Sequence, residues 1–144
     1  MTSTPQAPVL QPRTRAFARV MGPCLVIEAS LIIIRAPTMD RYATSFFSEP
    51  ALVWVTGSAM LFGGVAIIAF HQYWRGLAAI LISLLGWFIA LRGVALLAVP
   101  DWYAEAANMA GSTQSVRLIF VLPLAIGLWL TYTGWIARGV PSRD

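Results

Sequence analysis

Residues 76–100 read GLAAILISLLGWFIALRGVALLAVP, an apolar stretch that contains one charged residue, Arg92, and ends at a proline. A helix needs about 20 apolar residues to cross a bilayer, so this stretch is long enough to span one. Backbone polar groups must find partners within a spanning segment, because the bilayer core holds no water. We therefore expect residues 76–99 to form a membrane-spanning helix that Pro100 terminates.

Three further stretches of the chain have the same apolar character, and each is long enough to span a bilayer. They cover residues 17–36, 50–70 and 116–137. The sequence therefore predicts an all-α fold, an integral membrane four-helix bundle. We expect a disordered cytoplasmic tail over residues 1–15, a single four-helix transmembrane domain over 16–138, and a short cytoplasmic tail over 139–144.

The composition supports this class of protein. The chain has 144 residues, of which 58% are hydrophobic and 11% are charged, whereas a soluble domain carries roughly 25% charged residues. A soluble globular domain, a disordered chain and a disulfide scaffold are thereby excluded. The net charge is +4, but the basic residues do not cluster on one soluble face, so no nucleic-acid partner is expected. The lipid bilayer is the expected partner.

The arginines predict how the chain lies in the membrane. With four spans, both termini and the middle loop share one side, which carries Arg13, Arg15, Arg19, Arg75, Arg138 and Arg143. The other side carries Arg35, Arg41 and Arg117. Basic residues favour the cytoplasmic side of a membrane. We therefore expect a multi-pass protein of the bacterial inner (plasma) membrane with both termini in the cytoplasm.

Small residues recur along the third predicted helix at alternating spacings of three and four. They are Gly76, Ala79, Ser83, Gly86, Ala90 and Gly93. This spacing places them on one face of a helix, where small residues let a neighbouring backbone approach closely. We expect this helix-packing face to be central to the bundle or to form the seam of a homo-oligomer.

Two opposite charges lie inside predicted spans. A charge near the bilayer centre costs about 2.5 to 3.5 kcal/mol, so it is expected to be paired, hydrated or functional. Glu28 and Arg92 lie nine and eight residues before the prolines that end their helices, which puts them at depths within about 1.5 Å of each other. We expect a buried Glu28–Arg92 ion pair. Arg35, on the same helical face as Glu28, is a candidate auxiliary charge for the same cavity.

Three roles for these two charges stay open. They could form a structural lock that fixes the helix register, or a proton or anion site, or each could face a partner protein. Aromatic and histidine side chains are predicted as interfacial anchors at the membrane boundaries: His71, Trp74, Trp102 and Tyr103. One histidine, one cysteine and scattered carboxylates do not build a metal site. No metal, cofactor or catalytic residue is therefore expected.

The two halves of the chain show a faint repeat. Pro37 ends the first predicted helix and Pro100 the third, and similar polar-aromatic triplets follow, residues 40–42 (DRY) and 101–103 (DWY). A duplication would give two similar helical hairpins of the same orientation, related by an axis along the membrane normal. The other explanation is that two such units arose independently. Residues 101–107 resemble a capped helix at the membrane surface.

The middle of the chain resembles a group of small uncharacterised bacterial four-helix membrane proteins. The residues that carry the resemblance are residues 71–74 (HQYW), 85–87 (LGW) and 91–93 (LRG), followed by Pro100. In that group an asparagine often follows the histidine and a lysine often precedes the last glycine; this chain has Gln72 and Arg92. The resemblance covers about residues 49–103. It implies a four-helix membrane protein with a basic residue in the third helix, and no activity.

Three functions are open at this level. The favoured one is a non-enzymatic packing, assembly or accessory subunit, as a homo-oligomer or within a larger membrane complex. The alternative is a small transporter or proton-coupled carrier that uses a buried Glu28–Arg92 pair. The third is a membrane enzyme or redox subunit with His71 or Trp87 near a cofactor.

Overall fold

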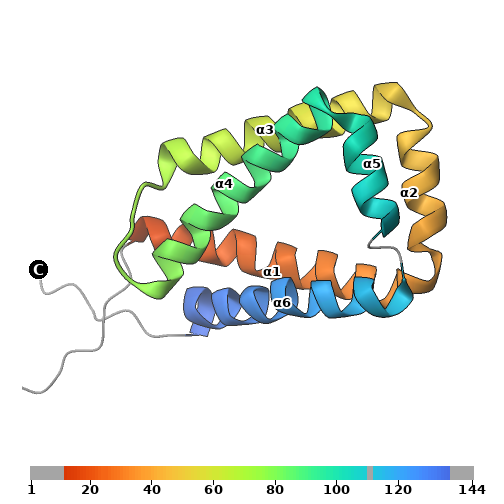
Figure 1. Ribbon diagram of the computed structural model, residues 1–144. Helices are drawn as coiled ribbons and strands as arrows, with labels where there is room; N and C mark the ends of the chain where they lie inside the picture. The colour runs from red at the N-terminus through yellow and green to blue at the C-terminus, as the bar shows by residue number, and fades with distance from the viewer. Residues whose placement is uncertain (1–11, 110–111, 137–144) are drawn as a thin grey trace, which may run out of the picture.

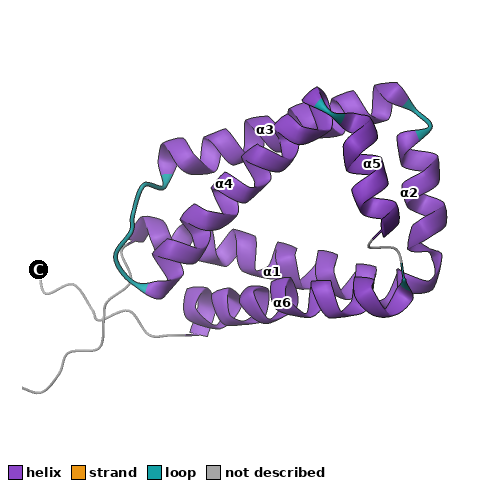
Figure 2. Cartoon of the chain, in the orientation of Figure 1, coloured by secondary structure: helices purple, strands orange, loops and turns teal. Residues whose placement is uncertain are grey.

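The computed structural model describes residues 12–109 and 112–136, and these residues are almost entirely helical (Figures 1 and 2). In chain order the elements are α1 (Pro12–Arg35), the 3₁₀ turn η1 (Ala36–Thr38), α2 (Met39–Phe47), α3 (Pro50–Phe70), α4 (Leu77–Ala98), α5 (Pro100–Met109), α6 (Thr113–Thr131) and the π-helical turn η2 (Tyr132–Ile136). The predicted all-α class with four long apolar helices is confirmed.

Four helical stretches are long and apolar enough to cross a membrane: Pro12–Phe47, Pro50–Phe70, Leu77–Ala98 and Thr113–Ile136. Their outward surface is apolar, and large side chains such as Phe62 and Ile34 are 79% and 72% exposed. Water would oppose such exposure, whereas lipid tails match it. The chain therefore has the build of a multi-pass membrane protein.

The long helices form two pairs, α3 with α4 and α1 with α6 (Figure 1). The sequence repeat predicted hairpins within each half of the chain, but both observed pairs join one half to the other. Close backbone contacts explain this choice. A Cβ on Gly64 of α3 would overlap the backbone of Ala90 in α4, and a Cβ on Gly22 of α1 would lie 2.5 Å from the backbone nitrogen of Thr131 in α6.

The two helix pairs meet at one end of the molecule, which we call the closed end. There α1 begins, η2 ends the described chain, and residues 71–76 connect α3 to α4 (Figure 1). The side chains of Ala18, Ala78, Ile82 and Leu130 form the buried core at this end. The pairs diverge from it toward the opposite end, which we call the open end.

At the open end two short helices, α2 and α5, contact each other and bridge the diverging pairs (Figure 1). Each follows a proline that ends a long helix: Pro37 lies in η1, and Pro100 begins α5. The helix expected over residues 101–107 is therefore present as part of α5. These two short helices therefore lie between the pairs at the open end.

The terminal boundaries differ from the prediction on one side. Residues 12–15, which we expected in a disordered tail, belong to α1, because an arginine-rich turn precedes its apolar part without a helix breaker. The rest of that tail, residues 1–11, and the predicted tail over 139–144 lie outside the described residues.

Candidate functional site

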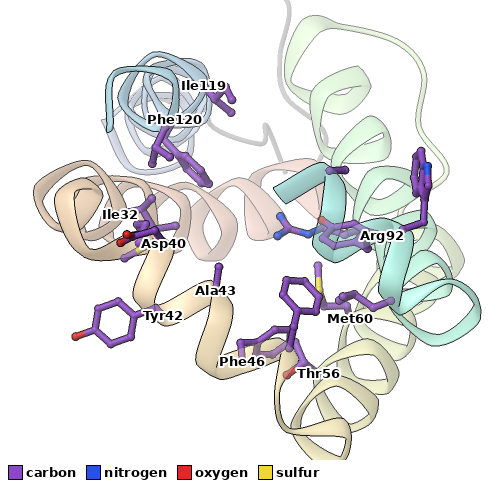
Figure 3. Close-up of a pocket in the computed structure, with 17 residues that line it drawn as sticks. Ile32, Asp40, Tyr42, Ala43, Phe46, Thr56, Met60, Arg92, Ile119 and Phe120 are labelled. Atoms are coloured by element: carbon purple, nitrogen blue, oxygen red, sulfur yellow. The ribbon is translucent and has the colours of Figure 1, made fainter. Parts of the chain in front are cut away.

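A pocket of about 690 Å³ lies between the two helix pairs at the open end (Figure 3). Every one of the six α-helices contributes to its wall, which is formed by Ile32, Met39, Asp40, Tyr42, Ala43, Phe46, Phe47, Thr56, Met60, Arg92, Leu96, Trp102, Tyr103, Ala106, Val116, Ile119 and Phe120. Small-molecule sites in proteins typically have volumes of about 300 to 1,000 Å³ and mostly apolar walls with a few polar groups. This pocket has both properties.

Arg92 is the cation of the pocket wall. It is half-buried on α4, and its guanidinium group extends toward the middle of the pocket (Figure 3). Its Nε atom is buried and has no hydrogen-bond partner in the part of the chain that the structure describes. Arginine stays protonated in proteins and offers five N–H donors. The pocket therefore presents a charge whose hydrogen-bonding capacity is not satisfied by the described residues.

Aromatic rings connect this cation to the short helices. The Cζ atom of Arg92 lies 5.5 Å from the centre of the Tyr103 ring, within the range of a cation–π contact. The Tyr103 ring lies 6.1 Å from that of Phe47, which is packed edge-on against Phe46 at 5.0 Å. This chain of contacts holds Arg92 of α4 against α5, and α5 against α2.

Asp40 is the acidic residue of the wall, and it comes from the start of α2. Figure 3 shows it beside Ile32, on the side of the pocket across from Arg92. Among the described residues it forms no ion pair with Arg92. The two charges therefore give the pocket a positive side and a negative side.

The expected Glu28–Arg92 ion pair is not formed between these two described residues. Glu28 is exposed and is not part of the pocket wall. Glu28 nevertheless lies one helical turn from Ile32, which does line the pocket. Both charges lie ten residues beyond the closed-end contacts Ala18 and Ile82, and the helix pairs have diverged by that level. Depth and face follow from the sequence, but the width of the gap does not.

Arg35 does not supply a second charge to the pocket wall. It is exposed, and its Nη1 donates a hydrogen bond of 2.9 Å to the hydroxyl of Tyr42. The guanidinium also lies 6.0 Å from the centre of that ring. Arg35 thus contacts a wall residue, because the 3₁₀ turn η1 redirects the chain from α1 into α2, which carries Tyr42 (Figure 1).

His71 is buried rather than interfacial, with 1% of its surface exposed. Its Nε2 lies 3.1 Å from the hydroxyl of Thr14, and its Nδ1 lies 3.2 Å from the hydroxyl of Ser83. Ser83 donates to the carbonyls of His71 and Tyr73. Because the hydroxyl hydrogen of Ser83 is directed to carbonyl oxygens, Nδ1 is assigned as the donor to Ser83. In the neutral imidazole, Nε2 then accepts from Thr14.

Burial lowers the pKa of His71 below its ordinary value of 6.5, because desolvation penalises the charged imidazolium. The ring of Phe17 on α1 packs edge-on against the imidazole at 5.3 Å. His71 therefore joins the start of α1 to the start of α4. It was predicted as an interfacial anchor, because it is a lone histidine in the turn between two apolar stretches and lies near Trp74.

The predicted helix-packing face of α4 is buried at Ala79, Ser83, Gly86, Ala90 and Gly93. The part of this face that is nearer the open end lies against α3, where a Cβ on Gly93 would overlap the backbone of Leu61. Gly76 does not belong to this face. It precedes α4 with φ +90°, a conformation that favours glycine, and a Cβ there would meet nothing within 4 Å. Its glycine serves the turn, not helix contact.

The remaining predicted anchors lie at both ends of the molecule. Trp74 is exposed in the connection at the closed end, and Trp102 is exposed at the start of α5. Tyr103 instead turns inward to Arg92. Trp87, considered above for a cofactor site, is half-exposed and lines a smaller cavity of about 240 Å³ together with His71 and Ser83. Within residues 12–109 and 112–136, no three His, Cys, Asp or Glu side chains gather where they could hold a metal ion.

Two parts of the site were not foreseen from the sequence. One is the Thr14–His71–Ser83 network, whose members are far apart in the chain and have no shared motif. The other is the contribution of α2 to the pocket. The apolar residues of α2 lie on one side of a short helix, Met39, Ala43, Phe46 and Phe47, and this helical spacing was the available signal.

Comparisons with protein-family models, with curated proteins and with solved structures found no match to this chain. The resemblance to small bacterial four-helix proteins stays a prediction.

Proposed function

We propose that this protein is a non-enzymatic accessory component of the bacterial inner membrane, and that it holds a small amphipathic molecule between its two helix pairs. The observation that carries the proposal is the pocket of about 690 Å³ whose wall comes from all six α-helices. A pocket that needs the whole fold ties ligand occupancy to the arrangement of the helices. Such coupling suits a subunit that reports on, or is stabilised by, a membrane molecule.

The excess of arginine on one side supports an orientation with both termini in the cytoplasm. In that orientation the closed end faces the cytoplasm and the pocket faces the outer half of the membrane. The molecule would then be drawn from the outer leaflet or from the outer aqueous phase.

A substitution that fills the pocket tests the proposal. Ala43 lines the pocket on α2, whereas Ala51 on α3 is exposed and lies outside it. We expect native mass spectrometry of the wild-type protein, purified in mild detergent, to show a bound molecule of small mass. Ala43→Trp should lose it, and the matched variant Ala51→Trp should keep it. Equal occupancy in both variants would contradict the proposal.

The same spectra report the state of assembly. A homo-oligomer or a larger complex would be seen as a higher mass. The buried glycines of α4 contact α3 of the same chain, so we expect Gly93→Leu to disturb the monomer fold rather than a subunit seam.

A small carrier is a second candidate, because Glu28 and Arg92 lie at matched depths on helices that diverge from a common contact. Closure of the open end would bring the two charges together, and opening would separate them. If so, Glu28→Gln and Arg92→Leu should each abolish proton-coupled uptake by reconstituted vesicles, while Arg117→Leu should not. Uptake that is equal in all four proteins, or no uptake in the wild type, would exclude the carrier.

A further inference from the structure

The pocket combines an unsatisfied cation with an aromatic wall, and this combination limits what can occupy it. The wall holds six aromatic side chains: Tyr42, Phe46, Phe47, Trp102, Tyr103 and Phe120. Apolar walls of this kind bind an apolar body, and a small number of polar groups orient it. The polar group that faces the middle of the pocket is the guanidinium of Arg92 (Figure 3).

The charge of Arg92 is stabilised only in part by the described protein. Its buried Nε has no hydrogen-bond partner among the described residues, and its Cζ lies 5.5 Å from the centre of the Tyr103 ring. A cation–π contact engages the face of a guanidinium, whereas a carboxylate or phosphate engages its N–H edge with two parallel hydrogen bonds. A cation–π contact with Tyr103 and a bidentate contact with an anion are therefore compatible on one guanidinium group.

Neither Glu28 nor Asp40 supplies this anion. Glu28 is exposed and outside the pocket wall. Asp40 lies across the pocket and forms no ion pair with Arg92. A like charge disfavours an anion near Asp40 and directs it to the opposite side. The charge distribution therefore favours a negatively charged ligand and also determines its orientation in the pocket.

We propose that the pocket binds an amphipathic organic anion, with its carboxylate or phosphate on the N–H edge of Arg92 and its apolar body among the aromatic side chains of α2, α5 and α6. This inference rests on the proposed function and adds the chemical class of the ligand. The two headgroup chemistries share the bidentate contact that arginine provides, and the binding experiment distinguishes them.

The experiment measures equilibrium binding to the full chain in dodecyl maltoside, an uncharged detergent. Four probes are compared: laurate, dodecyl phosphate, dodecanol and inorganic phosphate. Laurate, dodecyl phosphate or both should bind at least tenfold more tightly than dodecanol, which has the same chain without the charge. Inorganic phosphate alone should not compete, because the apolar body supplies much of the affinity.

Variants locate the anion. Arg92→Leu should remove the preference for laurate over dodecanol, and Arg92→Lys should weaken laurate binding by a smaller factor because it keeps the charge but loses the planar N–H edge. Arg117→Leu is the matched control, since this exposed arginine of α6 lies outside the pocket wall. Asp40→Asn should leave laurate binding unchanged or make it tighter.

The outcomes distinguish an error in the assigned ligand charge from a failure of the proposed function. If dodecanol binds as tightly as laurate, or Arg92→Leu binds laurate like the wild type, the anion assignment is wrong while the pocket still binds amphiphiles. If no probe binds, or Ala43→Trp binds all probes like the wild type, the proposed function fails with it. Tight binding of inorganic phosphate alone would also contradict the proposal that the ligand is amphipathic.

Discussion

The closed end and the open end of this molecule are built from the same four long helices but solve different problems. At the closed end, small residues such as Ala18 and Ala78 let the helix pairs touch, and His71 forms hydrogen bonds with Thr14 and Ser83. At the open end, large aromatic residues and Arg92 hold the pairs apart around a pocket. The distance between the helix pairs therefore depends on the size of the side chains at each level of the helices.

The largest expected effect comes from breaking a helix pair, on which both ends depend. Gly64→Leu should abolish recovery of folded protein, because even a Cβ at Gly64 would overlap the backbone of Ala90. Overpacking of this kind costs more than about 3 kcal/mol where the backbone must move. The neighbouring variant Gly63→Leu is the control, since a Cβ there meets nothing within 4 Å. Thermal unfolding in detergent compares them, and similar melting temperatures would refute the close approach of α3 and α4.

The second largest effect is expected when a substitution removes the hydrogen bonds of His71 at the closed end. His71→Leu should lower the free energy of unfolding by about 1 to 3 kcal/mol, because the hydroxyl of Thr14 loses its hydrogen-bond partner in a buried position. Thr14 is buried, whereas the hydroxyl of Ser83 keeps the carbonyl oxygens of residues 71 and 73 as acceptors. The exposed neighbour supplies the control, Gln72→Leu, with an expected change within about 0.5 kcal/mol. Steric-trap unfolding in bilayer discs provides the measurement, and a loss no larger than that of Gln72→Leu would show that the network is dispensable.

A smaller effect is expected in the pH dependence of the free energy of unfolding, because His71 titrates at the closed end. The folded state lowers the pKa of His71 below 6.5, so the unfolded chain binds more protons between the two pKa values. Stability is therefore complete above pH 6.5 and declines as the pH falls through this interval, by about 1.4 kcal/mol for each unit of pKa difference. Unfolding free energies measured from pH 8 to pH 5 should show this slope in the wild type. His71→Gln should remove it, and an unchanged slope would assign it to another group.

The smallest effect on stability is expected at the open end. Arg92→Leu should leave the free energy of unfolding unchanged or raise it by about 1 kcal/mol, because it removes a half-buried charge that has no ion-pair partner among the described residues. The contact with Tyr103 that it also removes is worth about 0.5 to 1 kcal/mol. Chemical unfolding of ligand-free protein tests this contrast with His71→Leu. A loss above about 2 kcal/mol would mean that Arg92 has a structural partner.

Several features of the site could be predicted from the sequence because they depend on local spacing. The depth of Glu28 and Arg92 follows from the rise per residue, and the small-residue face of α4 follows from helical periodicity. The His71 network could not be predicted, because Thr14 and Ser83 are 57 and 12 residues away and nothing local requires them to meet it. The missing ion pair has the same origin, since helix divergence is a property of two pairs together.

The sequence by itself determined that the chain is all-α, that it has four apolar helices and where prolines end two of them. These properties follow from hydropathy, backbone chemistry and the length a bilayer demands. Only the tertiary structure decided that the helices pair between the halves, that one end closes around His71 and that the other leaves a pocket beside Arg92. The physical reason is that helix contacts inside lipid depend on close backbone approach at a few positions. One sequence offers small residues on several helices and is therefore compatible with several helix pairings.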